Sequence, residues 1–211
     1  MIAPRYATAD RMLCLKVASD DAWILEAARG LEAVLADHAH CEMKAASNAL
    51  SLAARHPDRP AVVRALTDLA REEIDHFQRV FEVLSRRGIV LGPPEVDTYA
   101  RELRRAAAAA TKPRVEPLVD RLLVGAIIEA RSCERFKLLL GAVSGDPELH
   151  AFYTELFAAE ARHYRTFVDL AVGAAGGDAA LVDARLDVLS SLEASIVVRL
   201  AAAARRSTMH G

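Results

Sequence analysis

The chain has 211 residues, of which 53% are hydrophobic and 27% charged, and its formal net charge is −2. This composition predicts one globular domain, and the charge does not indicate a nucleic-acid-binding protein, whose usual mark is a strongly basic surface. The three cysteines form no CxxC pair, which argues against a disulfide framework or a structural zinc site. With no signal peptide and no run of about 18 apolar residues, we expect a cytoplasmic protein without a membrane span.

Abundant alanine and scarce aromatic residues favour a mostly helical protein. The first long helical segment is expected from about Asp20 to His56, with a kink or break at Gly30. The second is expected to begin near Pro60 and to end near Gly88, because proline suits the first turn of a helix and glycine follows the last.

A connecting helix is expected after Asp97, within the long segment 88–115. The third long helix is expected from about Glu116 to Val143, and the fourth from Asp146 to about Val172. A last amphipathic helix is expected over about residues 178–205, and no strand pattern is convincing. Two helical hairpins joined by one long crossover define the ferritin-like four-helix bundle. We therefore predict an all-α, ferritin-like single domain over residues 1–211, with its core bundle at about 20–173.

Two Glu-x-x-His motifs lie on the second and fourth predicted helices, as Glu73 with His76 and Glu160 with His163. Residues three positions apart share a face of a helix, so each pair can bind one metal ion. Either motif alone would also suit a solvated, charged helix face. Two copies on two hairpins favour a single site with two metals.

Such a site needs one more glutamate from each of the first and third helices. Glu42 lies 31 residues before Glu73, and Glu129 lies 31 residues before Glu160. The two glutamates of each hairpin are therefore expected to lie at the same height along the antiparallel helices. Glu134 would lie about 7 Å nearer the turn, and we expect it to support a ligand or to form an ion pair. The predicted metal ligands are Glu42, Glu73, His76, Glu129, Glu160 and His163.

His38 lies one turn before Glu42, where it either supports that ligand from behind or is an ordinary core histidine. Four inward-facing carboxylates would be costly to bury without cations. Carboxylates with two imidazoles suit iron or manganese, and zinc is less suited to a redox reaction. Two metals about 3.5–4 Å apart could activate dioxygen.

Four stretches around these residues resemble the bacterial tRNA 2-methylthio-N6-isopentenyladenosine hydroxylases of the MiaE type. They are "DHAHCEMKAASNAL", "LAREEIDHFQRVFEVLSRRGI", "VGAIIEARSCERF" and "EARHY", and "IEARSCERF" is the most specific of them. The resemblance implies a di-iron monooxygenase that uses dioxygen and electrons from a donor protein or another reductant. It would hydroxylate the isopentenyl group on the adenosine beside the tRNA anticodon, with the six predicted ligands holding two catalytic irons.

A tRNA substrate implies local basic groups that contact phosphate, although a solvated helix face would explain such groups equally well. The candidates are Arg86, Arg87, Arg101, Arg104, Arg105, Lys112 and Arg114. Two other functions remain open. A ferritin-like ferroxidase or peroxide-reducing protein would use the same six ligands without acting on RNA. A non-catalytic helical interaction protein would need no metal.

Overall fold

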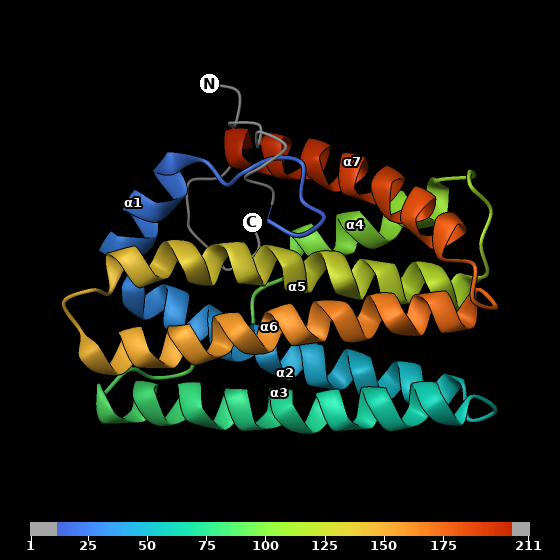
Figure 1. The fold of residues 1–211 in the computed structure, drawn as a ribbon. Helices are drawn as coiled ribbons and strands as arrows, with labels where there is room; N and C mark the ends of the chain where they lie inside the picture. Colours follow the sequence, from blue (N-terminus) through green and yellow to red (C-terminus); the bar gives the residue numbers. More distant parts are fainter. Residues whose placement is uncertain (1–11, 204–211) are drawn as a thin grey trace. The chain divides into compact units, whose positions relative to one another are not determined.

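The computed structural model describes residues 12–203, and every regular element in that range is an α-helix (Figure 1). The described residues form two compact units, one of residues 12–28 and 97–203 and the other of residues 29–96. A single domain over residues 1–211 stays a prediction. Residues 204 and 205, at the end of the predicted last helix, lie outside the described residues.

The unit of residues 29–96 is a helical hairpin of α2 (Leu31–Arg55) and α3 (Pro60–Arg86). The expected break at Gly30 separates α2 from the short helix α1 (Asp21–Arg29). Pro60 is the first residue of α3, as predicted. The chain leaves α3 through Gly88, whose φ of 70° is a conformation that glycine adopts without strain.

The other unit contains the second hairpin, α5 (Pro117–Ala142) with α6 (Pro147–Ala174), and the helices α4 (Thr98–Ala109) and α7 (Ala179–Ala203). α4 and α7 pack against each other and against α5. The carboxylates of Asp97 and Asp146 accept hydrogen bonds from the backbone N–H of Ala100 and Leu149, at 2.8 and 3.1 Å, so both aspartates are the N-caps expected from the sequence.

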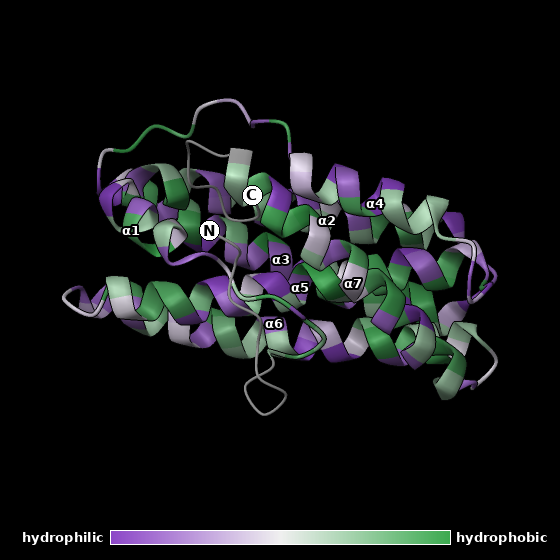
Figure 2. Ribbon diagram, turned by 90° about the horizontal axis from the view of Figure 1, so that it is seen from above, coloured by the Kyte–Doolittle hydropathy of each residue, from purple (hydrophilic) through white to green (hydrophobic). Residues whose placement is uncertain are grey.

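Hydrophobic and hydrophilic residues alternate along the helices at short intervals (Figure 2), as expected where each helix buries one side. α5 differs from this pattern, because nearly all of its residues from Leu118 to Phe136 are buried. Its contacts with α4, α6 and α7 explain that burial. None of the helices between residues 12 and 203 combines the length and the apolar character needed to cross a membrane.

A buried arginine, Arg185, fixes α7 within its unit. Its guanidinium donates to both carboxylate oxygens of Asp120 on α5, at 2.7 and 2.9 Å. It also donates to the carbonyl oxygens of Ala107 and Lys112, at 3.0 and 3.3 Å. A bidentate arginine–carboxylate pair is strongly directional, so it sets the position of α7 against the start of α5 and the end of α4.

Gly125 of α5 is required by close packing against α6. A Cβ atom at this position would lie 2.9 Å from the ring of Phe167. We expect Gly125→Ala to lower the free energy of unfolding by about 1–3 kcal/mol, because the buried ring must move. A Cβ atom at Gly141 of the same helix would meet no other atom within 4 Å, so Gly141→Ala is the matched control.

The control is expected to leave stability unchanged or to raise it by up to about 1 kcal/mol, since alanine favours helix. Urea denaturation followed by far-UV circular dichroism measures both variants. Equal effects of the two substitutions would contradict the close packing of Gly125 on Phe167.

Candidate metal centre

The hairpin of α2 and α3 brings together three of the predicted ligands, Glu42, Glu73 and His76. One ligand atom from each lies within 4.8 Å of the other two, and all three side chains are buried. The 31-residue spacing is responsible, because it places Glu42 level with Glu73 on the facing sides of antiparallel helices. His76 follows one turn later on the same side of α3.

His38 contacts the Glu42 carboxylate directly, with its Nε2 atom 2.5 Å from Oε1. Burial alone would raise the pKa of Glu42, but the hydrogen bond and the charge of His38, with further hydrogen bonds from His76 and Glu73, hold it well below its usual value. His38 is therefore positioned to hold the Glu42 carboxylate in one orientation, and its support of a metal ligand stays a prediction.

The imidazole of His76 lies between two carboxylates. Its Nδ1 atom is 3.3 Å from Glu73 Oε2 and 3.7 Å from Glu42 Oε2. Burial favours the neutral ring, but hydrogen bonds to Glu42 and Glu73 and their negative charges raise the pKa of His76 to about 10. The two carboxylates thus stabilise a positive charge at this point in the hairpin.

The hairpin of α5 and α6 repeats the arrangement with Glu129, Glu160 and His163. One ligand atom from each lies within 4.8 Å of the others, and these side chains are also buried. Cys133 lies one turn after Glu129, and its thiol donates to the carbonyl oxygen of Phe157 at 3.5 Å. Burial, and then the charge of Glu129, raises the pKa of Cys133 to about 12, so the thiol stays protonated.

The donor set of each hairpin fits a divalent transition metal. Two carboxylates and one imidazole provide hard oxygen and borderline nitrogen ligands, a combination that suits iron and manganese. Two such sets match the glutamates and Glu-x-x-His motifs of di-metal carboxylate proteins. The sequence predicted which residues each hairpin brings together, and their binding of metal remains a proposal.

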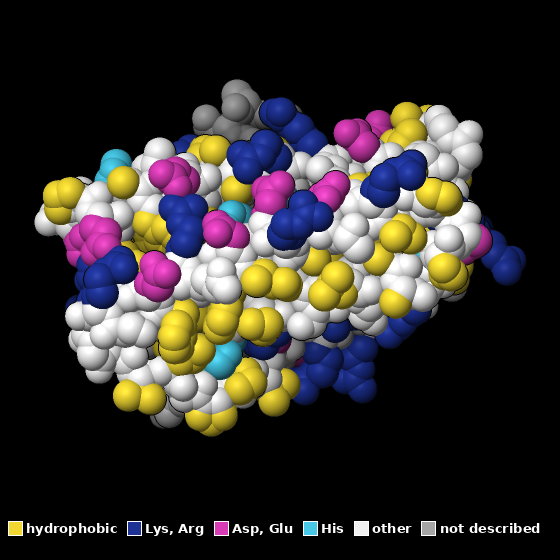
Figure 3. Space-filling model, turned by 90° about the horizontal axis from the view of Figure 1, so that it is seen from below, with side chains coloured by type: hydrophobic (Ala, Val, Ile, Leu, Met, Phe, Trp, Pro, Cys, Tyr) yellow, Lys and Arg dark blue, Asp and Glu magenta, His cyan; other side chains and the backbone are white. Residues whose placement is uncertain are grey.

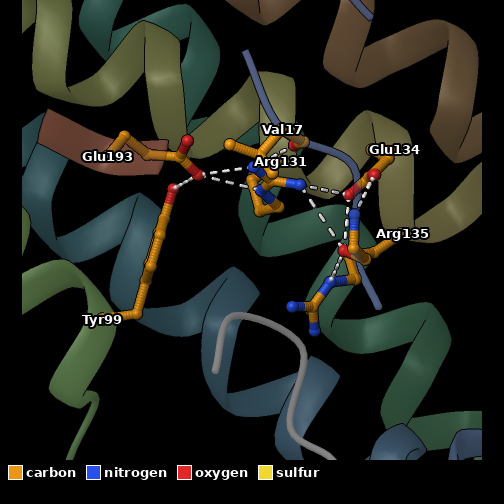
Figure 4. Close-up of polar contacts among 7 residues, drawn as sticks. Val17, Tyr99, Arg131, Glu134, Arg135 and Glu193 are labelled. Atoms are coloured by element: carbon orange, nitrogen blue, oxygen red, sulfur yellow. Dashed lines mark hydrogen bonds and ion pairs between the residues drawn. The ribbon is translucent and has the colours of Figure 1, made fainter. Parts of the chain in front are cut away.

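The side of α5 away from Glu129 carries a buried network of ion pairs centred on Arg131 (Figure 4). Arg131 donates to Glu193 Oε1 of α7 through Nε at 2.9 Å and Nη2 at 2.8 Å, and to Glu134 Oε2 through Nη1 at 2.5 Å. Tyr99 of α4 donates to the same oxygen of Glu193 at 3.1 Å. The network therefore joins α4, α5 and α7.

The segment before α1 is bound into this network. Ser19 donates to the two carboxylate oxygens of Glu134, through its backbone N–H at 2.7 Å and its hydroxyl at 2.6 Å. Arg131 donates to the carbonyl oxygen of Val17 at 3.0 Å, and Arg135 donates to the Ser19 hydroxyl at 2.9 Å. A chain segment without helical structure is held on α5 by these contacts.

The charges of the network balance, with two arginines and two glutamates. Burial disfavours the charged form of Arg131, but the charges of Glu193 and Glu134 more than compensate and raise its pKa. Burial raises the pKa of Glu193, although the positive charge of Arg131 opposes this rise. Burial and the like charge of Arg131 lower the pKa of Arg135 to about 10. Arg131 is thus the cation on which the two carboxylates depend.

The motif "IEARSCERF" divides between two sides of α5. Glu129 and Cys133 belong to the ligand side, whereas Arg131, Glu134 and Arg135 form the network. Glu134 forms the ion pair that was one of its two expected roles, and its support of a ligand stays a prediction. Arg131 and Glu193 were not among the predicted site residues, although charged residues on the buried side of an amphipathic helix were a visible signal.

The basic residues predicted to contact RNA are exposed, but they differ in their surroundings. On α3, Nη1 of Arg86 lies 3.8 Å from Oε2 of Glu82. Arg71, which is not a predicted contact, pairs similarly with Asp68, with 3.0 Å between Nη2 and Oδ1. Most Lys and Arg side chains on the face drawn in Figure 3 lie beside Asp and Glu, and one group of basic side chains projects from its lower edge. RNA contact by any of the predicted residues remains a proposal.

Comparison with known proteins identifies relatives. A family model for tRNA-(MS2IO6A)-hydroxylase (MiaE) matches residues 7–210. The tRNA 2-(methylsulfanyl)-N(6)-isopentenyladenosine(37) hydroxylase of Pseudomonas putida is 45% identical over 151 residues, which are 72% of this chain and 71% of that protein. The protein of the same name from Salmonella typhimurium is 30% identical over 84% of this chain and 81% of that protein.

A solved structure has the same fold. It is described as protein 43 with aldehyde deformylating oxygenase activity from Synechococcus, and it matches with a TM-score of 0.82 and 35% identity. The match covers 93% of this chain and 95% of that one, and it confirms the predicted all-α, ferritin-like fold class. The family model and the two named relatives show that the chain belongs to the tRNA-(MS2IO6A)-hydroxylase (MiaE) family.

Proposed function

We propose that this protein is an oxygen-dependent di-iron monooxygenase acting on tRNA. It hydroxylates the isopentenyl group of 2-methylthio-N6-isopentenyladenosine beside the anticodon. The observation that carries the proposal is the buried Glu and Glu-x-x-His set on each of two hairpins, in a chain that is 45% identical to a hydroxylase named for this nucleoside.

The proposed metal ligands are the six residues of the two sets. Glu42, Glu73 and His76 come from one hairpin, and Glu129, Glu160 and His163 from the other. Four carboxylates match the four positive charges of two Fe²⁺ ions, which accounts for the burial of so many acidic groups. We propose that both sets contribute to one centre, as in other ferritin-like proteins with two metals.

When bound, two iron ions supply the oxidising power that no side chain has, since they can take up dioxygen and electrons and oxidise an unactivated C–H bond. The side chains position and protect that chemistry. His38 holds the Glu42 carboxylate in one orientation through its 2.5 Å contact. Phe167, one turn beyond His163 on α6, is buried and packs on Gly125 of α5, so this part of the hairpin is apolar.

A base in an anticodon loop is not locked in a duplex, so it can be unstacked and inserted into a pocket of the enzyme. The reaction also needs two electrons from outside, and we propose an electron-donor protein or another reductant as their source. The ferroxidase alternative would use the same six ligands, but both named relatives favour a tRNA substrate.

Oxygen consumption distinguishes the two functions. Iron-loaded, reduced protein is mixed with dioxygen and with tRNA that either carries or lacks the isopentenyl group. A tRNA hydroxylase should consume oxygen faster with the modified tRNA and should convert its nucleoside to the hydroxylated form, detected by mass spectrometry. Equal consumption with both tRNAs, without a hydroxylated nucleoside, would support the ferroxidase and overturn the proposal.

A further inference from the structure

The outward side of α4 carries three arginines, Arg101, Arg104 and Arg105, and all three side chains are exposed. They lie at i, i+3 and i+4, so they share one side of the helix with neighbouring Cβ atoms about 5–6 Å apart. The opposite side of α4 is buried in its own unit and consists of Tyr99, Ala100, Leu103 and Ala107. The packing of α4 therefore fixes the direction in which the arginines point.

These positive charges exceed the negative charge of α4, whose one acidic residue interacts electrostatically with Arg101 and Arg105 but forms its ion pair with another helix. That residue, Glu102, is paired with Arg199 of α7 at 2.5 Å. Arg101 donates to the hydroxyl of Thr98 at 3.5 Å. Among residues 12–203, no hydrogen-bond or ion-pair partner is found for the side chains of Arg104, Arg105, Lys112 and Arg114.

α3 provides the contrast within the same protein. It also carries several exposed arginines, but Asp68 and Glu82 pair with two of them, Arg71 and Arg86. An arginine with a carboxylate neighbour has less to gain from a phosphate, because the existing pair must first be broken. The basic residues of α4 and of the loop that follows have no such cost.

We propose that the α4 basic side, defined as Arg101, Arg104, Arg105, Lys112 and Arg114, binds the backbone phosphates of tRNA. This inference rests on the proposed function, and it names the surface that the substrate uses. A planar guanidinium donates two parallel hydrogen bonds to one phosphate, which suits arginine better than lysine. Phosphate contacts fix the position of an RNA without reading its sequence.

The α4 basic side also explains how a protein of net charge −2 attracts a polyanion. Phosphate binding depends on local charge, since solvent-exposed charges farther apart than about 8–10 Å are largely screened at physiological ionic strength. Five exposed cations and one carboxylate, which is paired with Arg199, lie on this helix and its following loop and provide such a local field. The rest of the surface then does not need to be basic.

The test compares two triple variants that lose the same number of charges. Arg101→Gln, Arg104→Gln and Arg105→Gln remove the centre of the α4 basic side. Arg64→Gln, Arg71→Gln and Arg79→Gln remove three arginines of α3, none of which is a predicted RNA contact. Glutamine has nearly the helix propensity of arginine, so both variants should fold, which far-UV circular dichroism checks.

The probe is an unmodified, fluorescently labelled tRNA transcript, titrated by anisotropy at several salt concentrations. We expect the α4 variant to bind on the order of tenfold to a hundredfold more weakly, with a slope of log K against log salt that is shallower by about 2–3. The α3 variant should match the wild type. In turnover, the α4 variant should show a raised KM for tRNA with a nearly unchanged kcat.

Binding of the α4 variant within twofold of the wild type, or an equal loss in the α3 variant, would overturn the inference. So would a wild-type protein that does not bind the transcript. A third outcome separates the two proposals. If the α4 variant loses tRNA binding but the wild-type protein hydroxylates no tRNA, the α4 surface is supported and the proposed function is overturned.

Discussion

Replacing Arg131 with methionine is expected to lower the free energy of unfolding by about 3–5 kcal/mol. Arg131 is fully buried and donates to Glu193, Glu134 and the carbonyl oxygen of Val17. Methionine fills much of the same volume but donates nothing, so two buried carboxylates lose their cation. Urea denaturation monitored by circular dichroism measures the loss.

The loss should shrink as the pH falls. Burial already raises the pKa of Glu193, and removing Arg131 removes the charge that opposes this rise. A carboxyl group with a higher pKa in the folded than in the unfolded state takes up its proton more readily when folded. Its stabilising contribution is complete below the unfolded pKa and is lost as the pH rises through the folded pKa. The variant should therefore lose less relative to wild type near pH 5 than near pH 8.

Two further variants separate a lost charge pair from a general packing defect. Combining Arg131→Met with Glu193→Leu should cost less than Arg131→Met alone, because one unpaired carboxylate is removed. Arg199 lies on α7, like Glu193, and forms an ion pair near the surface with Glu102 of α4. Arg199→Met breaks this pair and should lower the free energy of unfolding by less than about 1 kcal/mol. Equal losses in Arg131→Met and Arg199→Met, without a pH dependence, would contradict the central role of Arg131.

Replacing Glu73 with glutamine is expected to abolish hydroxylation of tRNA and to lower the iron content from about two to about one per chain. Glu73 is buried, and a carboxylate oxygen of Glu73 lies within 4.8 Å of ligand atoms of Glu42 and His76. Glutamine keeps the size of the side chain but removes the negative charge that a cation needs. Iron analysis after reconstitution and a turnover assay measure the two effects.

The control for this variant is Glu72→Gln, one position earlier on α3. Glu72 is exposed and belongs to neither set of candidate ligands. The Glu72→Gln protein should keep both the iron content and the activity of the wild type. A Glu73→Gln protein with full iron and full turnover would show that the α2–α3 hairpin holds no metal.

The ligand candidates could be predicted because they depend on local periodicity. A helix repeats every 3.6 residues, so Glu-x-x-His lies on one side whatever surrounds it. The turn after α2 is short, so one count through it places Glu42 level with Glu73. Pro60, Asp97 and Asp146 mark helix starts through equally local chemistry.

The buried ion pairs could not be predicted in the same way. Arg131 finds Glu193 at a separation of 62 residues, and Arg185 finds Asp120 at a separation of 65. No periodic pattern encodes which charged residues of two distant helices will meet. The amphipathic pattern over residues 178–205 predicted that α7 buries one side, but the partners of Arg185 and Glu193 on that side depend on how α4, α5 and α7 pack.

The most direct test of the proposed function is the mass of the nucleoside released from tRNA after turnover under isotopically labelled dioxygen. Iron-loaded, reduced wild-type protein should convert 2-methylthio-N6-isopentenyladenosine to its hydroxylated form, heavier by one atom of labelled oxygen. The Glu73→Gln protein should leave the nucleoside unchanged. If the nucleoside is not hydroxylated after full iron loading, or if its new hydroxyl group carries unlabelled oxygen from water, the protein is not an oxygen-dependent tRNA hydroxylase.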